Sequence, residues 1–148
     1  MLGANLAPAQ EEDDLVGCCV SSASGYRRAA SRLTASDFHQ PSRARLFAAC
    51  GRLDHLSGPG LDVEEERIAS VTRLAGVPEA EVRRLVEDRC VQFDRAGHLA
   101  RKVLAASQSR LVMRFGKDIH NAIAAGEQLA DVLADVPDDI VHLLGVRR

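Results

Sequence analysis

Histidine, cysteine and carboxylate side chains are the residues of this chain whose chemistry could support metal binding or catalysis. The histidines are scattered, and none stands in an HExxH or other metal-ligand spacing; they are His39, His55, His98, His120 and His142. The cysteines include no CxxC pair, and no base is arranged to activate one of them; they are Cys18, Cys19, Cys50 and Cys90. We therefore predict no metal site and no catalytic residue.

The carboxylates and the glycine–lysine pair also have structural interpretations. The run of Asp62 and Glu64–Glu66 is typical of a helix start, where negative charge complements the helix dipole. The cluster of Asp135, Asp138 and Asp139 around Pro137 has the same interpretation, and no EF-hand spacing is present. Gly116-Lys117 lies within a helical pattern and lacks the G-x-x-x-x-G-K-[ST] phosphate loop. We predict that the chain is not an enzyme and takes no cofactor.

A group of basic residues in the second half of the chain is a candidate binding patch. Its members are Arg101, Arg110, Arg114 and Lys117, the last three at i, i+4 and i+7. One interpretation is an electrostatic patch for a partner, and the other is a solvated outer face. Direct DNA contact ranks third, since the net charge is −2 and no aromatic residues interleave the basic ones.

The composition favours helices around an aliphatic core. Of 148 residues, 46% are apolar and 3% aromatic, and Ala and Leu favour helix over strand. No signal peptide and no apolar run long enough for a membrane span is present. We predict an all-α, cytoplasmic protein with reduced thiols and no membrane contact.

Caps and apolar spacing predict a head of short helices over residues 11–93, after a flexible tail over 1–10. Helices are expected at about 11–20, 26–33, from Pro41, at 63–75 and from Pro78. Thr34 with Asp37, and Asp62 with Glu65, resemble N-terminal caps. Gly76 is a C-terminal stop.

Residues 94–148 are predicted to form a long helical hairpin with a C-terminal segment. No proline interrupts about 94–125, and Gly126 closes this first arm. A second arm follows from Leu129, and the short loop implies antiparallel packing. Pro137 either kinks this arm or begins a last helix.

The order of these motifs resembles the N-terminal domain of DnaB-type replicative helicases. The resemblance spans about residues 11–136 and starts with Glu12 and the Leu15-Val16-Gly17 opening. Further matching positions follow in order: Leu33, Asp37-Phe38, Leu46-Phe47, Ala49, Leu61-Asp62, Ala100-Arg101, Arg110 and Arg114. Arg43 stands where that family usually has His, and Pro137 is unexpected in it. The sequence stops where the family's linker and ATPase domain would follow.

The resemblance implies hairpins that pair between copies, and a collar that docks primase. Apolar residues spread around the first arm, Met113 among them, and an apolar outer side needs a partner. The predicted interface consists of Leu104, Leu111, Val112, Phe115, Ile119, Ile123, Leu129 and Leu133.

We therefore predict a non-catalytic interaction module of DNA replication, a homodimer or higher oligomer. Its expected partners are a replicative helicase, a primase or a helicase loader. The alternative is the N-terminal piece of an ATP-dependent DnaB-type helicase whose motor lies outside this sequence.

Overall fold

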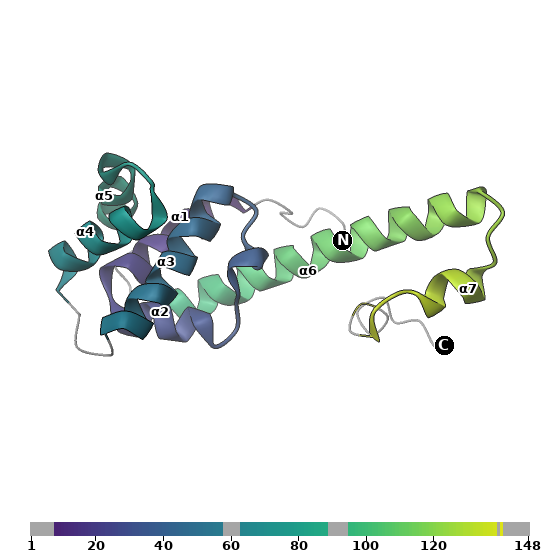
Figure 1. Cartoon of the computed structure of the whole chain (residues 1–148), viewed down its shortest axis with the longest axis horizontal. Coiled ribbons are helices and arrows are strands. Elements are labelled where there is room, and N and C mark those ends of the chain that lie inside the picture. The colour runs from purple at the N-terminus through teal and green to yellow at the C-terminus, as the bar shows by residue number, and fades with distance from the viewer. Residues whose placement is uncertain (1–7, 58–62, 89–94, 139, 141–148) are drawn as a thin grey trace. The chain divides into compact units, whose positions relative to one another are not determined.

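The computed structural model of the chain describes residues 8–57, 63–88, 95–138 and 140. Within these residues all regular structure is helical (Figure 1). The elements in chain order are α1 (Ala9–Ser21), α2 (Ala23–Ala30), η1 (Ala35–Asp37), α3 (Pro41–Ser57), α4 (Glu64–Ala75), α5 (Glu79–Asp88), α6 (Arg95–Ala124) and α7 (Leu129–Ala134). The predicted all-α class is confirmed.

The described residues divide into two compact units between Ala105 and Ala106, within α6. We call residues 8–105 the head and residues 106–140 the hairpin. The boundary expected at 93/94 and most of the expected tail lie outside the described residues.

Local sequence signals set several helix ends. The capping box at Thr34 and Asp37 is present, with the Thr34 amide donating to the Asp37 carboxylate at 2.8 Å. Gly76 (φ 66°) ends α4 in the left-handed conformation, which glycine adopts without steric cost. Asp62, the other expected cap, lies outside the described residues. Helix α2 begins three residues before its predicted start, because Ser22 accepts from the Gly25 amide at 2.9 Å and acts as its N-cap.

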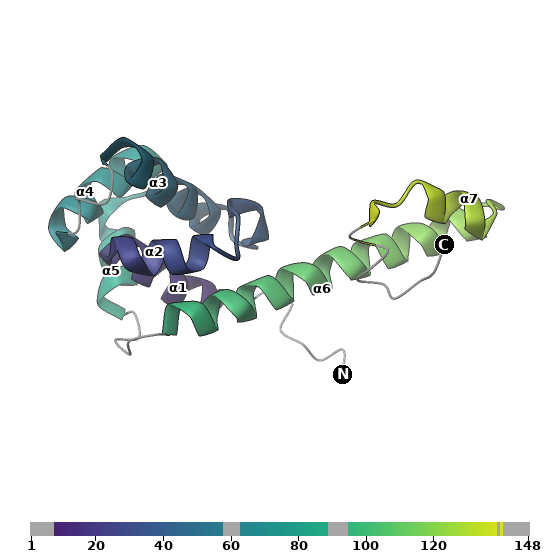
Figure 2. The ribbon, with the colours of Figure 1, turned by 90° about the horizontal axis from the view of Figure 1, so that it is seen from below.

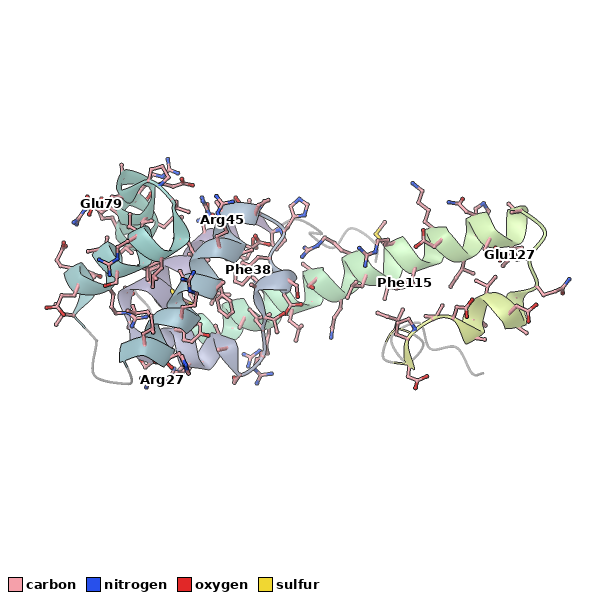
Figure 3. The ribbon with its side chains drawn as sticks, viewed as in Figure 1. Arg27, Phe38, Arg45, Glu79, Phe115 and Glu127 are labelled. Carbon is pink, nitrogen blue, oxygen red and sulfur yellow. The ribbon has the colours of Figure 1, made fainter. Side chains whose placement is uncertain are left out.

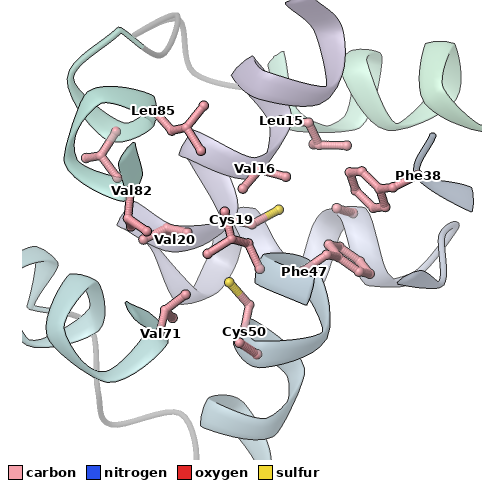
Figure 4. Close-up of a cluster of buried hydrophobic side chains, with 14 of the residues drawn as sticks. Leu15, Val16, Cys19, Val20, Phe38, Phe47, Cys50, Val71, Val82 and Leu85 are labelled. Carbon is pink, nitrogen blue, oxygen red and sulfur yellow. The ribbon is translucent and has the colours of Figure 1, made fainter. Parts of the chain in front are cut away.

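Helix α1 is the centre of the head and contacts α2, α3, α4 and α5. Its buried side chains join those of the surrounding helices in one cluster (Figure 4). The first part of α6 completes the cluster with Ala96, Leu99, Ala100 and Val103. The head therefore has a continuous aliphatic core, as the composition indicated.

In the hairpin, α7 runs back alongside the end of α6 (Figures 1 and 2). Gly126 (φ 95°) makes the turn, as expected from its position. Helix α7 ends at Ala134, three residues before the proline. The Pro137 carbonyl accepts from the Ile140 amide at 3.0 Å, so the proline opens a new helical turn instead of kinking α7.

Candidate functional site

The two arms of the hairpin pack along an inner seam. Val136 and Ile140 of the second arm are buried, and three half-buried residues of α6 pack against them: Leu111, Phe115 and Ile119. These α6 positions are four residues apart and share one helix face. Phe115, labelled in Figure 3, belongs to this seam. Its side chain therefore contributes mainly to joining the arms.

Other apolar residues of the hairpin lie outside the inner seam, and we call this set the outer face. It consists of Val112, Met113, Gly116 and Ile123 on α6, with Leu129 on α7. Met113, Ile123 and Leu129 are 49%, 44% and 51% exposed, while Val112 is half-buried. The α6 members are three, four and seven residues apart, which places them on one side of the helix.

Gly116 gives the outer face a flat centre. A Cβ added at Gly116 would meet no atom within 4 Å, so the space over the glycine is open. Glycine inside a helix costs about 1 kcal/mol relative to alanine. Its benefit at such a position is that another backbone can approach closely.

The structure distributes the predicted interface residues over three places. Leu104 is half-buried against the head core, and Leu133 is buried in the hairpin. Leu111, Phe115 and Ile119 lie in the inner seam, and Val112, Ile123 and Leu129 lie on the outer face. Met113 is absent from the predicted interface, although its position beside Val112 was visible in the sequence.

The predicted basic residues are spread along α6. Arg101 is exposed and belongs to the head, whereas Arg110 is half-buried in the hairpin. Arg114 and Lys117 are exposed, and the Arg114 guanidinium lies 5.7 Å from the centroid of the Phe115 ring. At that distance a cation over an aromatic face is attracted to it.

Three of the carboxylates on the second arm lie within α7 or close to its ends: Glu127, Asp131 and Asp135. All three are exposed. They are four residues apart, so the helical pair of Asp131 and Asp135 projects to one side.

The head holds a buried carboxylate at the position where the family resemblance begins. Glu12 is fully buried, and its carboxylate accepts from the backbone amides of His39 at 2.7 Å and Gln40 at 3.1 Å. These amides precede Pro41 at the start of α3, where backbone donors lack helical partners. Glu12 thus acts as a remote N-terminal cap, which no local pattern reveals.

At the other end of α1, Arg67 donates hydrogen bonds to backbone carbonyls, whereas Glu12 accepts them from backbone amides. It is 1% exposed, its Nε donates to the Val20 carbonyl and its guanidinium donates to the Cys19 carbonyl, both at 2.8 Å. Carbonyls in the last turn of a helix lack helical partners, and a buried cation there also complements the dipole.

Arg43 joins three helices of the head. Its Nε donates to Asp13 of α1 at 2.6 Å, and its guanidinium also pairs with Glu81 of α5. Burial lowers the pKa of Arg43, but the hydrogen bonds to Asp13 and Glu81 outweigh burial and raise it. The residue that departs from the family pattern is therefore a buried structural cation here.

The core thiols are poorly suited to nucleophilic chemistry. Cys19 and Cys50 are buried among aliphatic side chains (Figure 4). Burial raises the pKa of Cys50 to about 12 and raises that of Cys19 well above its usual value. Thiolates, the reactive form, are therefore scarce at neutral pH.

The described residues contain neither a metal-binding cluster nor a membrane-spanning helix. Among residues 8–57, 63–88, 95–138 and 140, no three His, Cys, Asp or Glu side chains cluster in a way that could hold a metal ion. In the same part of the chain, no helix combines the length and apolarity needed to cross a membrane.

A solved structure has a fold similar to that of this chain. The crystal structure of the N-terminal domain of DnaB helicase from Mycobacterium tuberculosis matches with a TM-score of 0.69. The match covers 91% of this chain and 94% of that chain, at 18% sequence identity. This chain has the fold of a DnaB helicase N-terminal domain.

The DnaB-like fold confirms the resemblance that the motif order suggested. No protein-family model matches the chain, and no curated protein matches it. The likeness therefore rests on architecture, and the hairpin surfaces of this chain must be judged on their own residues.

Proposed function

We propose that this chain is a non-catalytic interaction module of DNA replication that self-associates through the outer face of its hairpin. The observation that carries the proposal is the exposure of apolar side chains there. Of the five exposed large apolar side chains among the described residues, three lie on the outer face: Met113, Ile123 and Leu129. Several exposed apolar side chains gathered in one small unit favour an interaction site there. The DnaB-like fold supports the replication context.

Self-association is tested by sedimentation velocity across micromolar concentrations. Ile123→Asp and Met113→Asp place a charge on the outer face at positions that are about half exposed, so the fold should tolerate them. Leu56→Asp is the matched control, because Leu56 is 72% exposed on the head. We expect both outer-face variants to sediment as monomers at concentrations where the wild type and Leu56→Asp are oligomeric.

Phe115 is a poor choice for the same experiment, because it packs in the inner seam. A charge there should separate the arms, so a loss of association would not report on the outer face itself. A wild-type chain that stays monomeric at all concentrations, or outer-face variants that associate like the wild type, would contradict the proposal.

The proposed partners are a replicative helicase, its primase or its loader. The test mixes the chain with each purified protein and follows co-sedimentation, with Ile123→Asp as the variant and Leu56→Asp as the control. Binding to one of the three that depends on the intact hairpin is the expected result. Absence of binding to all three would remove the replication role while leaving self-association standing.

The second candidate is that this sequence forms the N-terminal part of an ATP-dependent DnaB-type helicase. The observation that favours it is the 94% coverage of a domain that itself belongs to a helicase. The coding sequence downstream decides between the two. A Walker A motor in the same reading frame supports the second candidate, and an in-frame stop codon contradicts it.

A further inference from the structure

The two arms of the hairpin carry opposite charge. The part of α6 that belongs to the hairpin, residues 106–124, has three Lys and Arg residues and one carboxylate, Asp118. Residues 125–140 have five Asp and Glu residues and no Lys or Arg. The charge is therefore segregated between the arms along the sequence, and not mixed as on an ordinary solvated helix pair.

Five exposed side chains of the hairpin make up a basic edge and an acidic edge. The basic edge is Arg114 and Lys117, three residues apart on α6. The acidic edge is Glu127, Asp131 and Asp135, four residues apart along the second arm. Within the part of the hairpin that the structure describes, none of these five side chains forms an ion pair with another residue of the same chain.

We propose that the basic edge of one copy binds the acidic edge of a second copy, so that charge selects how two hairpins pair. The proposal rests on the self-association proposed above and names what directs it. A two-fold symmetric interface makes each contact twice, since residue i meets residue j and j meets i. An α6 beside the partner's second arm therefore places Arg114 and Lys117 near Asp131 and Asp135 in both halves of the dimer.

The apolar outer face suits the same arrangement. Lys117 lies four residues after Met113 on the same side of α6, so a partner arm that covers Met113 also reaches the basic edge. Gly116 provides the flat point at which the partner's arm approaches. Apolar burial supplies most of the affinity, and the charged edges reject pairings that place like charges together.

Charge reversal tests the proposal. The first variant is R114E/K117E and the second is D131K/D135K, each checked for unchanged helix content by circular dichroism. Alone, each variant faces like charges twice and should associate roughly tenfold more weakly than the wild type. Mixed in equal amounts, the two variants regain attraction at both contacts and should form a heterodimer of near wild-type affinity.

A matched control separates local pairing from net charge. R32E/R84E changes the net charge as much as R114E/K117E does, but at two exposed positions of the head. It should associate like the wild type. Raising NaCl from about 0.05 M to about 0.5 M should weaken wild-type association by roughly tenfold. The Leu56→Asp control should lose affinity by the same factor.

Several results would overturn the charge pairing. One is wild-type association by both reversed variants, with Ile123→Asp still monomeric; self-association would then stand without the charge pairing. Another is failure of the mixed variants to recover affinity. A third is a basic-edge variant that associates normally but loses binding to a labelled single-stranded oligonucleotide, which would assign the edge to nucleic acid.

Discussion

The head and the hairpin use apolar and charged residues in opposite ways. In the described part of the head, aliphatic side chains from five helices and the start of α6 form one core, and three buried charged residues are hydrogen-bonded: Glu12, Arg43 and Arg67. In the hairpin, Val136 and Ile140 anchor a thin seam, while Met113, Ile123 and Leu129 remain exposed.

This difference separates stability from interaction. A buried charge with satisfied hydrogen bonds costs free energy to remove, so the head is intolerant of change. A thin two-helix unit gains little from burial within one chain. Burial of its exposed surface against a partner should therefore stabilise this part of the molecule most.

The largest expected difference between the two regions concerns thiol reactivity. Cys50 has a pKa of about 12 against a usual value of 9.0, so its thiolate at pH 8 is roughly a thousandfold scarcer than that of an ordinary thiol. A cysteine introduced by Ile123→Cys on the outer face should behave as an ordinary thiol. Timed alkylation and peptide mass mapping should show Cys50 reacting far more slowly, and equal rates would show that the head core admits solvent.

The same pKa shift gives a direction for stability against pH. A raised pKa means that the folded state favours the protonated thiol. The stabilisation is fully present below pH 9 and declines as pH rises towards about 12. Unfolding midpoints in urea should therefore fall over this range, and Cys50→Ala should reduce the slope.

Removing Arg67, one of two buried arginines described in the head, is the next largest effect. Arg67→Ala leaves the Cys19 and Val20 carbonyls without these donors and opens a cavity, so the free energy of unfolding should fall by about 3 to 4 kcal/mol. Arg73→Ala, at an exposed position of the same helix, should change it by less than about 0.5 kcal/mol. Equal losses of unfolding free energy in the two variants, measured by urea unfolding, would refute the capping role of Arg67.

A subtler change tests the cap at the start of α3. Glu12→Gln keeps the side-chain shape but replaces one acceptor oxygen with a donor facing the His39 and Gln40 amides. The free energy of unfolding should fall by about 2 kcal/mol. Glu66→Gln, which is exposed, is the control. A Glu12 variant as stable as this control would show that water replaces the carboxylate.

The substitution with the smallest expected effect, Gly116→Ala, should stabilise the fold but weaken self-association. Gly116→Ala should stabilise the helix by about 0.5 to 1 kcal/mol, since no neighbour blocks the new methyl group. The same methyl group should weaken self-association several-fold, because the partner approaches there. Gly97→Ala also adds a methyl into open space on α6, but in the head, and should leave association unchanged. Similar association by both variants would place the contact elsewhere.

The sequence predicts what depends on neighbouring residues. The box at Thr34 and the left-handed Gly76 each follow from residues within one turn of chain, and both are confirmed. The spacing of Leu111, Phe115 and Ile119 likewise predicts one helix face, which the inner seam confirms.

Contacts between residues that are far apart in the sequence cannot be predicted from such local patterns. Glu12 reaches the start of α3, and Arg67 reaches the end of α1, across intervals of 27 and 47 residues. Leu104 and Leu111 share one uninterrupted rhythm, although the first packs on the head core and the second in the hairpin. Periodicity gives the face of a helix but not the neighbour that covers it.

The Arg67 contact also orders events during synthesis. The Val20 carbonyl waits for a donor 47 residues further along the chain. At about 5 to 20 residues per second, this donor is added roughly two to ten seconds after Val20 itself. Until then the Cys19 and Val20 carbonyls lack the donors that Arg67 supplies. The central helix of the head is thus finished by a residue made much later, so the nascent head becomes protease-resistant after α4 has emerged, and not when α1 does.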